Sequence, residues 1–219
     1  MLSKNNFKLH VACDGSAASG KTTGAKLISK KYNLKFLSSG LLYRYAAYII
    51  LKNKTSKTEF LQNKFKFLNY KSLNKINLHN EKISNYAAII AKRPSIRKVL
   101  KKFQINFAKK NKRICIEGRD IGSVILPNAD VKYFFKCGLN IAAKRRIKEL
   151  KKKNKNITLN MVKKSLKLRN LSDTKRKNSP LLKTADAVLI DTGKTKSIKD
   201  MLRKMSIVLE KKFKNYDFE

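Results

Sequence analysis

Acidic residues, cysteines and histidines are all scarce in this chain of 219 residues. Its 14 aspartates and glutamates are outnumbered by 53 lysines and arginines, which gives a formal net charge of +39. Such a balance is typical either of a nucleic-acid-binding protein or of an enzyme that acts on anionic substrates and has a lysine-rich solvated surface. The lysines are spread along the whole chain, and no RGG run, zinc-ligand cluster or RNP-like aromatic run is present. We therefore favour the enzyme and expect no specific nucleic-acid partner.

The three cysteines, Cys13, Cys115 and Cys137, lie in or just after apolar runs, and no C-x-x-C spacing occurs. With only two histidines in the chain, we expect reduced core cysteines and no metal site built from these residue types. No run approaches the length of about 18 apolar residues that a membrane-spanning helix needs. The first ten residues, MLSKNNFKLH, lack the apolar segment and cleavage pattern of a signal peptide. These features favour a soluble cytoplasmic protein without a membrane partner.

Residues 15–22 read GSAASGKT and match the pattern G-x-x-x-x-G-K-[ST] of a phosphate-binding loop. The apolar run 9–13 before the loop predicts a strand, and the spacing over 21–32 predicts a helix. In such a loop the backbone N–H groups surround a polyphosphate and the helix N-terminus adds partial positive charge. Lys21 would reach the β- and γ-phosphates, and the Thr22 hydroxyl would bind Mg²⁺. A glycine-rich turn without a ligand is the alternative.

Short apolar runs separated by helical patterns predict a doubly wound α/β fold with a parallel sheet covered on both faces. Ligands then belong at the carboxyl ends of the strands. The predicted strands are 9–13, 34–37, 113–116, 131–135 and 187–190. The C-terminal stretch 197–213 predicts an amphipathic helix whose apolar face packs on the core. That face consists of Ile198, Met201, Leu202, Met205, Val208 and Leu209.

Two segments are too long or too basic for a simple alternation of strands and helices. Residues 38–110 predict an inserted substrate-binding region, because a single crossover would not need so many residues. Its expected helices are 41–52, 83–92 and 95–110, with a polar, poorly periodic stretch at 53–82. Residues 144–177 are rich in lysine, arginine and asparagine and pack few apolar residues, so they predict a mobile lid. The core of this single domain would be 1–37, 111–143 and 178–219.

Three polar segments offer candidate ligand contacts. SSGLLYR (38–44) and EGRDIG (117–122) each follow a predicted strand, and EGRDIG sets Arg119 beside Asp120. In SDTKRKNSPL (172–181), Asp173 and Arg176 are three residues apart and would share a helix face. A tight turn and an exposed ion pair are the alternatives for the last two segments.

Together, and in this order, six segments resemble the bacterial cytidylate kinase family. They are DGSAASGKT (14–22), SSGLLYR (38–44), PSIR (94–97), GRDIGSVILPNA (118–129), DTKRKNSPL (173–181) and TADAVLIDT (184–192). The resemblance runs from about residue 9 to the C-terminus. It implies a P-loop NTPase-type, five-stranded parallel sheet with an acceptor-nucleotide insert and a basic lid. It also implies a monomeric kinase that transfers phosphate from ATP, with Mg²⁺, to CMP and dCMP.

The resemblance also assigns roles to single residues. The ATP-binding residues it implies are Gly15, Ser16, Ala17, Ala18, Ser19, Gly20, Lys21, Thr22 and Thr23. The CMP-binding residues it implies are Ser39, Gly40, Tyr43, Arg44, Arg97, Arg119, Asp120, Asp173 and Arg176. Among these, Arg44, Arg119 and Arg176 would grip the CMP phosphate. Arg97 and Asp120 would read the cytosine, and Asp173 would bind the sugar hydroxyls. The catalytic cations would be Lys21, Arg119, Arg176 and either Arg145 or Arg146, which belong to the lid.

The chain departs from the family pattern at several positions. Ser38 replaces an aspartate, Ser16 replaces a proline, and the insert is shorter than in the longer members. Ala88 stands where many members have a serine that helps to hold the cytosine. Two other functions stay open. One is a P-loop kinase for another acceptor, such as UMP or a non-nucleotide metabolite. The other, suggested by the net charge of +39, is an ATP-switched nucleic-acid-binding protein.

Overall fold

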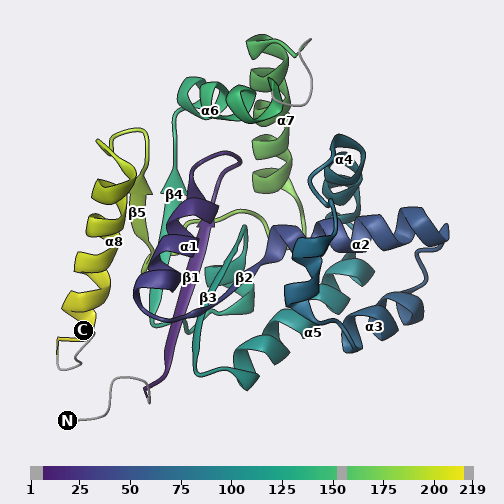
Figure 1. Ribbon diagram of the computed structural model, residues 1–219, viewed down its shortest axis with the longest axis horizontal. Coiled ribbons are helices and arrows are strands. Elements are labelled where there is room, and N and C mark those ends of the chain that lie inside the picture. The colour runs from purple at the N-terminus through teal and green to yellow at the C-terminus, as the bar shows by residue number, and fades with distance from the viewer. Residues whose placement is uncertain (1–6, 152–156, 215–219) are drawn as a thin grey trace. The chain divides into compact units, whose positions relative to one another are not determined.

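The computed structural model describes residues 7–151 and 157–214 (Figure 1). The chain divides into two compact units, which we describe separately. One unit comprises Met1–Leu37 and Asn111–Glu219, and the other is Ser38–Lys110. No helix within the described residues is long and apolar enough to cross a membrane.

A five-stranded parallel sheet forms the centre of the first unit. Its strands are β1 (Leu9–Gly15), β2 (Lys35–Ser38), β3 (Arg113–Gly118), β4 (Val131–Lys136) and β5 (Val188–Asp191), and they lie in the order β2-β3-β1-β4-β5 (Figure 1). β1 pairs in parallel with β3 and β4, so Val11 lies between Cys115 and Val131. A strand buried on both faces needs apolar residues at successive positions, which the sequence of β1 supplies. The sheet confirms the predicted fold class.

Helices α1 (Lys21–Lys31) and α8 (Ile198–Lys212) cover one face of this sheet. Met201, Met205 and Leu209 recur every four residues along α8 and are buried in the same cluster as Ile28 of α1. The prediction that Ile198 belongs to this face was wrong. Its side chain is 59% exposed, because it is the first residue of α8 and lies beyond the end of the apolar stripe.

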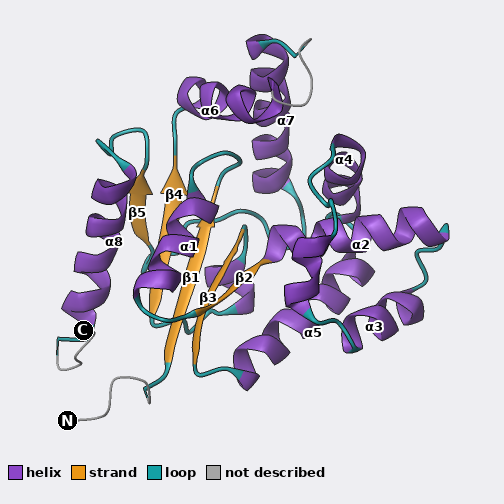
Figure 2. Cartoon of the chain, viewed as in Figure 1, coloured by secondary structure: helices purple, strands orange, loops and turns teal. Residues whose placement is uncertain are grey.

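Helices α6 (Leu139–Lys151) and α7 (Leu159–Lys175) follow β4 and pack against each other (Figure 2). The predicted lid region therefore packs more apolar residues than its composition suggested. Small alanines let the two helices approach closely, and Ala17 of the phosphate loop joins them. The buried members of this cluster are Ala17, Ala142, Ala143, Val162 and Leu166.

The second unit consists of helices. They are α2 (Ser39–Asn53), α3 (Thr58–Lys66), the 3-10 helix η1 (Tyr70–Lys75), α4 (Glu81–Ile90) and α5 (Pro94–Lys110). Helix α3 lies in the polar, poorly periodic stretch 53–82, for which no helix was predicted. Only Leu61 and Phe65 of α3 are buried, so its apolar pattern is too short to be recognised in the sequence. The ring of Phe65 packs edge-on against Tyr45 and Phe103, with centroids 5.6 Å and 5.7 Å away.

Candidate active site

The phosphate loop follows β1, and both of its glycines have a positive φ. Gly15 has φ of 152°, and a Cβ atom there would lie 2.3 Å from the carbonyl oxygen of Phe135. Gly20 has φ of 79° and precedes the first residue of α1, so it allows a left-handed turn into the helix. The Ser19 hydroxyl donates to the carbonyl of Ser16 at 2.9 Å and closes the loop on itself. The loop thus ends at a helix N-terminus, as phosphate binding requires.

Lys21 is buried at the start of α1, and its Nζ donates to Oε2 of Glu117 at 2.5 Å. Burial lowers the pKa of this lysine, while the nearby Glu117 carboxylate opposes the shift. Glu117 lies near the end of β3, opposite Cys13 in the pairing of β3 with β1. Glu117 was not among the predicted site residues. Its position at the carboxyl end of a strand was the signal that could have identified it.

Asp14, the residue before Gly15, is also buried and was not among the predicted site residues either. Its two carboxylate oxygens accept the backbone N–H groups of Ile121 (2.9 Å) and Gly122 (2.7 Å). The pKa of Asp14 is raised to about 6, mainly by burial and to a smaller extent by the negative charge of Asp120. The two N–H donors and Lys21 oppose this shift.

Four of the residues predicted to bind CMP lie close together in the first unit and form one cluster of mostly buried charges. Arg119 Nε donates to Oδ2 of Asp173 at 2.8 Å. Arg176 lies 3.7 Å from a carboxylate oxygen of Asp173 and 3.7 Å from one of Asp120. We expected Arg176 and Asp173 to share a helix face. Instead α7 ends at Lys175, and Arg176 has an extended backbone. Two cations and two carboxylates are nevertheless brought together at the end of β3.

The structure distinguishes Arg145 from Arg146. Arg145 donates through Nη1 to Oγ1 of Thr192 and through Nη2 to its carbonyl, both at 2.9 Å. The Thr192 hydroxyl in turn donates to the carbonyl of Ser19 at 2.9 Å, which links Arg145 to the phosphate loop. Arg146 instead pairs with the exposed Glu149 at 2.7 Å.

Helix α7 also contacts the loop directly. The Ala17 N–H donates to Oδ1 of Asn170 at 3.0 Å. Asn170 and Thr192 were not predicted as site residues, because each hydrogen-bonds to a partner far away in the sequence.

The other predicted acceptor residues lie in the second unit. Ser39 and Gly40 are the first residues of α2, where N–H groups point out of the helix. Arg97 is buried on α5, with its guanidinium carbon 5.8 Å from the centroid of the Tyr43 ring. Arg44 extends from α2 to the hydroxyl of Ser84, with Nε at 3.4 Å.

The family model described as cytidylate kinase matches residues 11–211. The chain belongs to the cytidylate kinase family. The cytidylate kinase of Rickettsia africae (strain ESF-5) is 39% identical over 184 residues, which cover 84% of each chain. That of Thermosipho melanesiensis (strain DSM 12029 / CIP 104789 / BI429) is 37% identical over 214 residues, covering 93% of this chain and 98% of that one.

A solved structure supports the fold alone. An uncharacterized protein from Eubacterium ventriosum ATCC 27560 superposes with a TM-score of 0.53, at 14% identity. The match covers 93% of this chain and 99% of that one.

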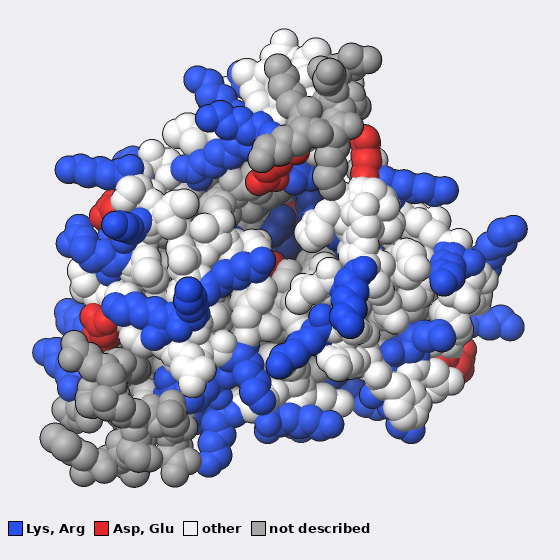
Figure 3. Space-filling view, in the orientation of Figure 1, with Lys and Arg blue, Asp and Glu red and all other residues white. Residues whose placement is uncertain are grey.

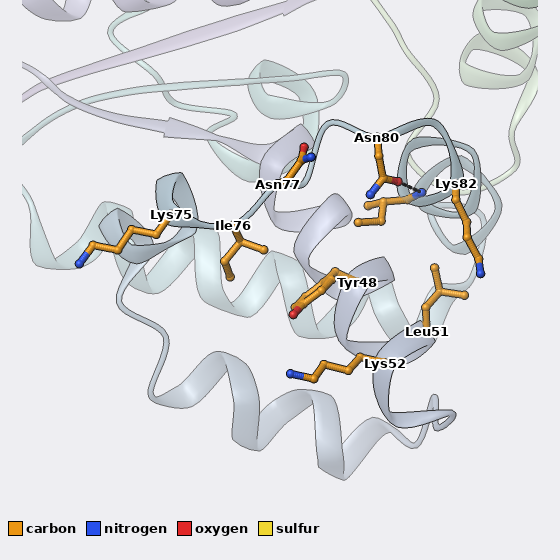
Figure 4. A pocket seen from close by; sticks show the side chains of 9 residues that line it. Tyr48, Leu51, Lys52, Lys75, Ile76, Asn77, Asn80 and Lys82 are labelled. Atoms are coloured by element: carbon orange, nitrogen blue, oxygen red, sulfur yellow. Dashed lines mark hydrogen bonds between the residues drawn. The ribbon is translucent and has the colours of Figure 1, made fainter. Parts of the chain in front are cut away.

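A surface pocket in the second unit contains none of the predicted site residues (Figure 4). Its lining residues are Tyr48, Leu51, Lys52, Lys75, Ile76, Asn77, Asn80, Lys82 and Ile83. The side chains of Lys75 and Lys82 point away from each other, and Asn80 Oδ1 is occupied by the N–H of Ile83. These groups do not converge on a common point, as a cytidylate kinase would need for a bound phosphate.

The residues around the phosphate loop fit a magnesium nucleotide. Thr22 is exposed in the first turn of α1, next to the buried Lys21. Its hydroxyl is an oxygen ligand of the kind that Mg²⁺ prefers, and the phosphates of a nucleotide would supply further oxygens.

Proposed function

We propose that this protein transfers the γ-phosphoryl group of ATP to CMP and dCMP, giving CDP or dCDP and ADP. The observation that carries the proposal is the cytidylate kinase match over residues 11–211, a range that contains every predicted site residue. A bond forms between an oxygen of the acceptor phosphate and the γ-phosphorus, and the bond to the β–γ bridging oxygen breaks. The acceptor oxygen is already ionised, so the reaction needs no general base.

The donor site would be the phosphate loop. ATP phosphates would accept the loop N–H groups, and Lys21 would turn from Glu117 to the β- and γ-phosphates. When bound through the Thr22 hydroxyl, Mg²⁺ would neutralise charge on these phosphates. Arg145 would contribute a cation at the edge of the loop, because Thr192 already holds its guanidinium next to Ser19 and Gly20.

The residues expected to bind the acceptor come from the charged cluster of the first unit and from helices of the second unit. Arg119 and Arg176 are held by carboxylates, so their guanidinium groups are oriented before CMP binds. With Arg44 they would grip the phosphate. Asp173 would bind the sugar hydroxyls, and Asp120 with Arg97 would bind the cytosine. Catalysis is then positioning and charge neutralisation.

A nucleic-acid-binding function finds less support. On the face shown in Figure 3, lysine and arginine side chains are scattered among uncharged residues and do not form a single stripe. Binding of a nucleic-acid duplex or single strand would be expected to require a continuous basic surface on the protein. The monomeric state and the cytoplasmic location stay predictions.

A coupled assay of ADP formation, run with ATP, Mg²⁺ and each nucleoside monophosphate in turn, tests the proposal. We expect turnover with CMP and dCMP and much less with UMP, AMP or GMP. Lys30→Ala, which changes an exposed lysine of the same helix as Lys21, is the matched control and should leave turnover unchanged. Strong turnover with a different acceptor, and none with CMP, would contradict the proposal.

A further inference from the structure

Asp14 connects the strand that begins the phosphate loop to the segment that carries Arg119 and Asp120. Asp14 lies opposite Gly118 in the pairing of β1 with β3. The chain leaves β3 after Gly118, passes through Arg119 and Asp120, and enters the short π-helix η2 (Ile121–Ile125). The two carboxylate oxygens of Asp14 accept the first two N–H groups of η2, at 2.9 Å and 2.7 Å.

These contacts replace a local cap. A helix usually begins with a side chain that accepts one of its own first N–H groups. Asp120 occupies that position in η2, yet its side chain makes no capping hydrogen bond. Asp14 satisfies these N–H groups from a neighbouring strand, and the Asp120 carboxylate lies 3.7 Å from Arg176 instead.

The choice of an aspartate at this position is otherwise costly. Burying a carboxylate disfavours its charged form, and Asp14 is only 5% exposed. An asparagine would avoid that cost, but its side chain offers one acceptor oxygen and two donor hydrogens. An ionised carboxylate can accept one N–H group on each of its two oxygens and presents no donor to either of them.

The packing around Gly122 shows how close this contact is. A Cβ atom at Gly122 would lie 3.4 Å from Oδ2 of Asp14 and 3.1 Å from Cδ of Lys132. Side chains from β1 and β4 thus both lie close to the place that a Cβ atom would take at Gly122, so η2 packs tightly against them.

We propose that Asp14 is a positioning residue for phosphoryl transfer, which holds Arg119 and Asp120 in register with the phosphate loop through the N–H groups of Ile121 and Gly122. The proposal rests on the proposed function, in which Arg119 binds the acceptor phosphate and Asp120 binds the base. Because Gly15 directly follows Asp14, one residue then sets the distance between the donor loop and part of the acceptor site. A misplacement of about 1 Å in such a site can slow a reaction about a hundredfold.

The test compares Asp14→Asn and Asp14→Ala with Ser29→Ala. Ser29 is the matched control, because it is equally buried and its hydroxyl donates to Ala25 of α1, away from η2. Steady-state kinetics with CMP and ATP should show KM for CMP raised and kcat lowered by about tenfold or more in Asp14→Ala. KM for ATP should change less than about threefold, and Asp14→Asn should lie between Asp14→Ala and the wild type.

Hydrogen exchange at the Ile121 and Gly122 amides gives a readout that does not depend on turnover. Both amides should exchange faster in Asp14→Ala than in the wild type or in Ser29→Ala. Two results would overturn the positioning role: unchanged CMP kinetics in a folded Asp14→Ala variant, or equal rises in KM for CMP and ATP. A wild-type protein without CMP turnover would instead overturn the proposed function itself.

Discussion

The Nζ atom of Lys21 lies 2.5 Å from Oε2 of Glu117, and both side chains are buried. The lysine that should bind ATP phosphates is therefore already paired with a carboxylate. Removing one partner of a buried ion pair destabilises a protein much more than replacing both partners, because the remaining charge is left buried without a partner. Under the proposed function, ATP binding would exchange one anion for another at Lys21, so the ammonium group would keep an anionic partner.

Lys21→Ala should abolish phosphoryl transfer and also destabilise the protein. Removal of one partner of a buried ion pair costs about 3–5 kcal/mol of the free energy of unfolding. The double variant Lys21→Ala/Glu117→Gln should regain part of this stability and stay inactive. Urea denaturation followed by circular dichroism measures the first effect, and the coupled assay measures the second. Activity above a few per cent in either folded variant would rule out the catalytic role of Lys21.

Arg145→Ala and Arg146→Ala should differ in their effect on ATP, although the two residues are neighbours in the sequence. Arg145 is held by Thr192 beside the phosphate loop, whereas Arg146 pairs with the exposed Glu149. We expect KM for ATP to rise by about tenfold or more in Arg145→Ala, as for the loss of a hydrogen bond to a charged group. Arg146→Ala serves as the control and should leave KM for ATP nearly unchanged. Equal effects would contradict the distinction.

Gly24→Ala should destabilise the protein, although alanine favours helices. Its Cβ atom would lie 2.7 Å from Cε1 of the buried Phe135 and 3.2 Å from Sδ of Met205. Overpacking of this kind costs about 1–3 kcal/mol, which exceeds the gain of about 1 kcal/mol in helix propensity.

Gly138→Ala is the control for this substitution, because a Cβ atom there would meet no atom within 4 Å. Its free energy of unfolding should stay within about 0.5 kcal/mol of the wild type in the same urea titration. If Gly24→Ala were as stable as Gly138→Ala, the packing of α1 against Phe135 would be looser than described.

The pKa of Asp14 gives the stability a dependence on pH. In the folded protein this pKa is raised to about 6, above the ordinary value of 3.8, so the folded state binds the proton more tightly than the unfolded chain does. The Asp14 contribution to the free energy of unfolding therefore rises as the pH falls from 7 towards 4. Between pH 7 and pH 5 the gain should be about 1 kcal/mol. The wild type, measured against Asp14→Asn by urea denaturation at both values, should show this difference; an opposite sign would mean that the two N–H donors outweigh burial.

The sequence predicts the sheet well because its signals are local. Each strand is a short apolar run, and the phosphate loop is a contiguous motif whose glycines meet a backbone requirement at Gly15 and Gly20. The six segments that resemble the family then identify it, and the family match confirms this. Helix α3 escaped prediction, because two buried residues do not make a recognisable period.

The parts of the candidate site that were not predicted are those whose role depends on a residue distant in the sequence. Glu117 and Asp14 acquire their roles because β1 and β3 pair, and Thr192 acquires its role because β5 ends next to the phosphate loop. A choice between Arg145 and Arg146 also needs the direction in which α6 turns its side chains. The roles of the predicted acceptor residues stay predictions.

Ala88 offers a test of base selectivity in the second unit. Ala88 is exposed on α4, one helical turn after Ser84, whose hydroxyl receives a hydrogen bond from Arg44. The resemblance to the family implies a serine at the position of Ala88 in many members, so we expect this chain to lack one polar contact to the cytosine. Ala88→Ser should therefore lower KM for CMP, but by no more than about tenfold, since one neutral hydrogen bond contributes about 0.5–1.5 kcal/mol. KM for ATP should not change.

The matched control for Ala88→Ser is Ile89→Ser, which places a hydroxyl at the next exposed position of the same helix, about 100° around its axis. It should not improve CMP binding, because its side chain points in a different direction. The wild type should also discriminate CMP from UMP less strongly than Ala88→Ser does, and the ratio of kcat/KM for the two acceptors measures this. An Ala88→Ser variant with unaltered CMP kinetics and an unaltered ratio would show that α4 does not approach the base at this position, and that Arg97 and Asp120 provide the selectivity without it.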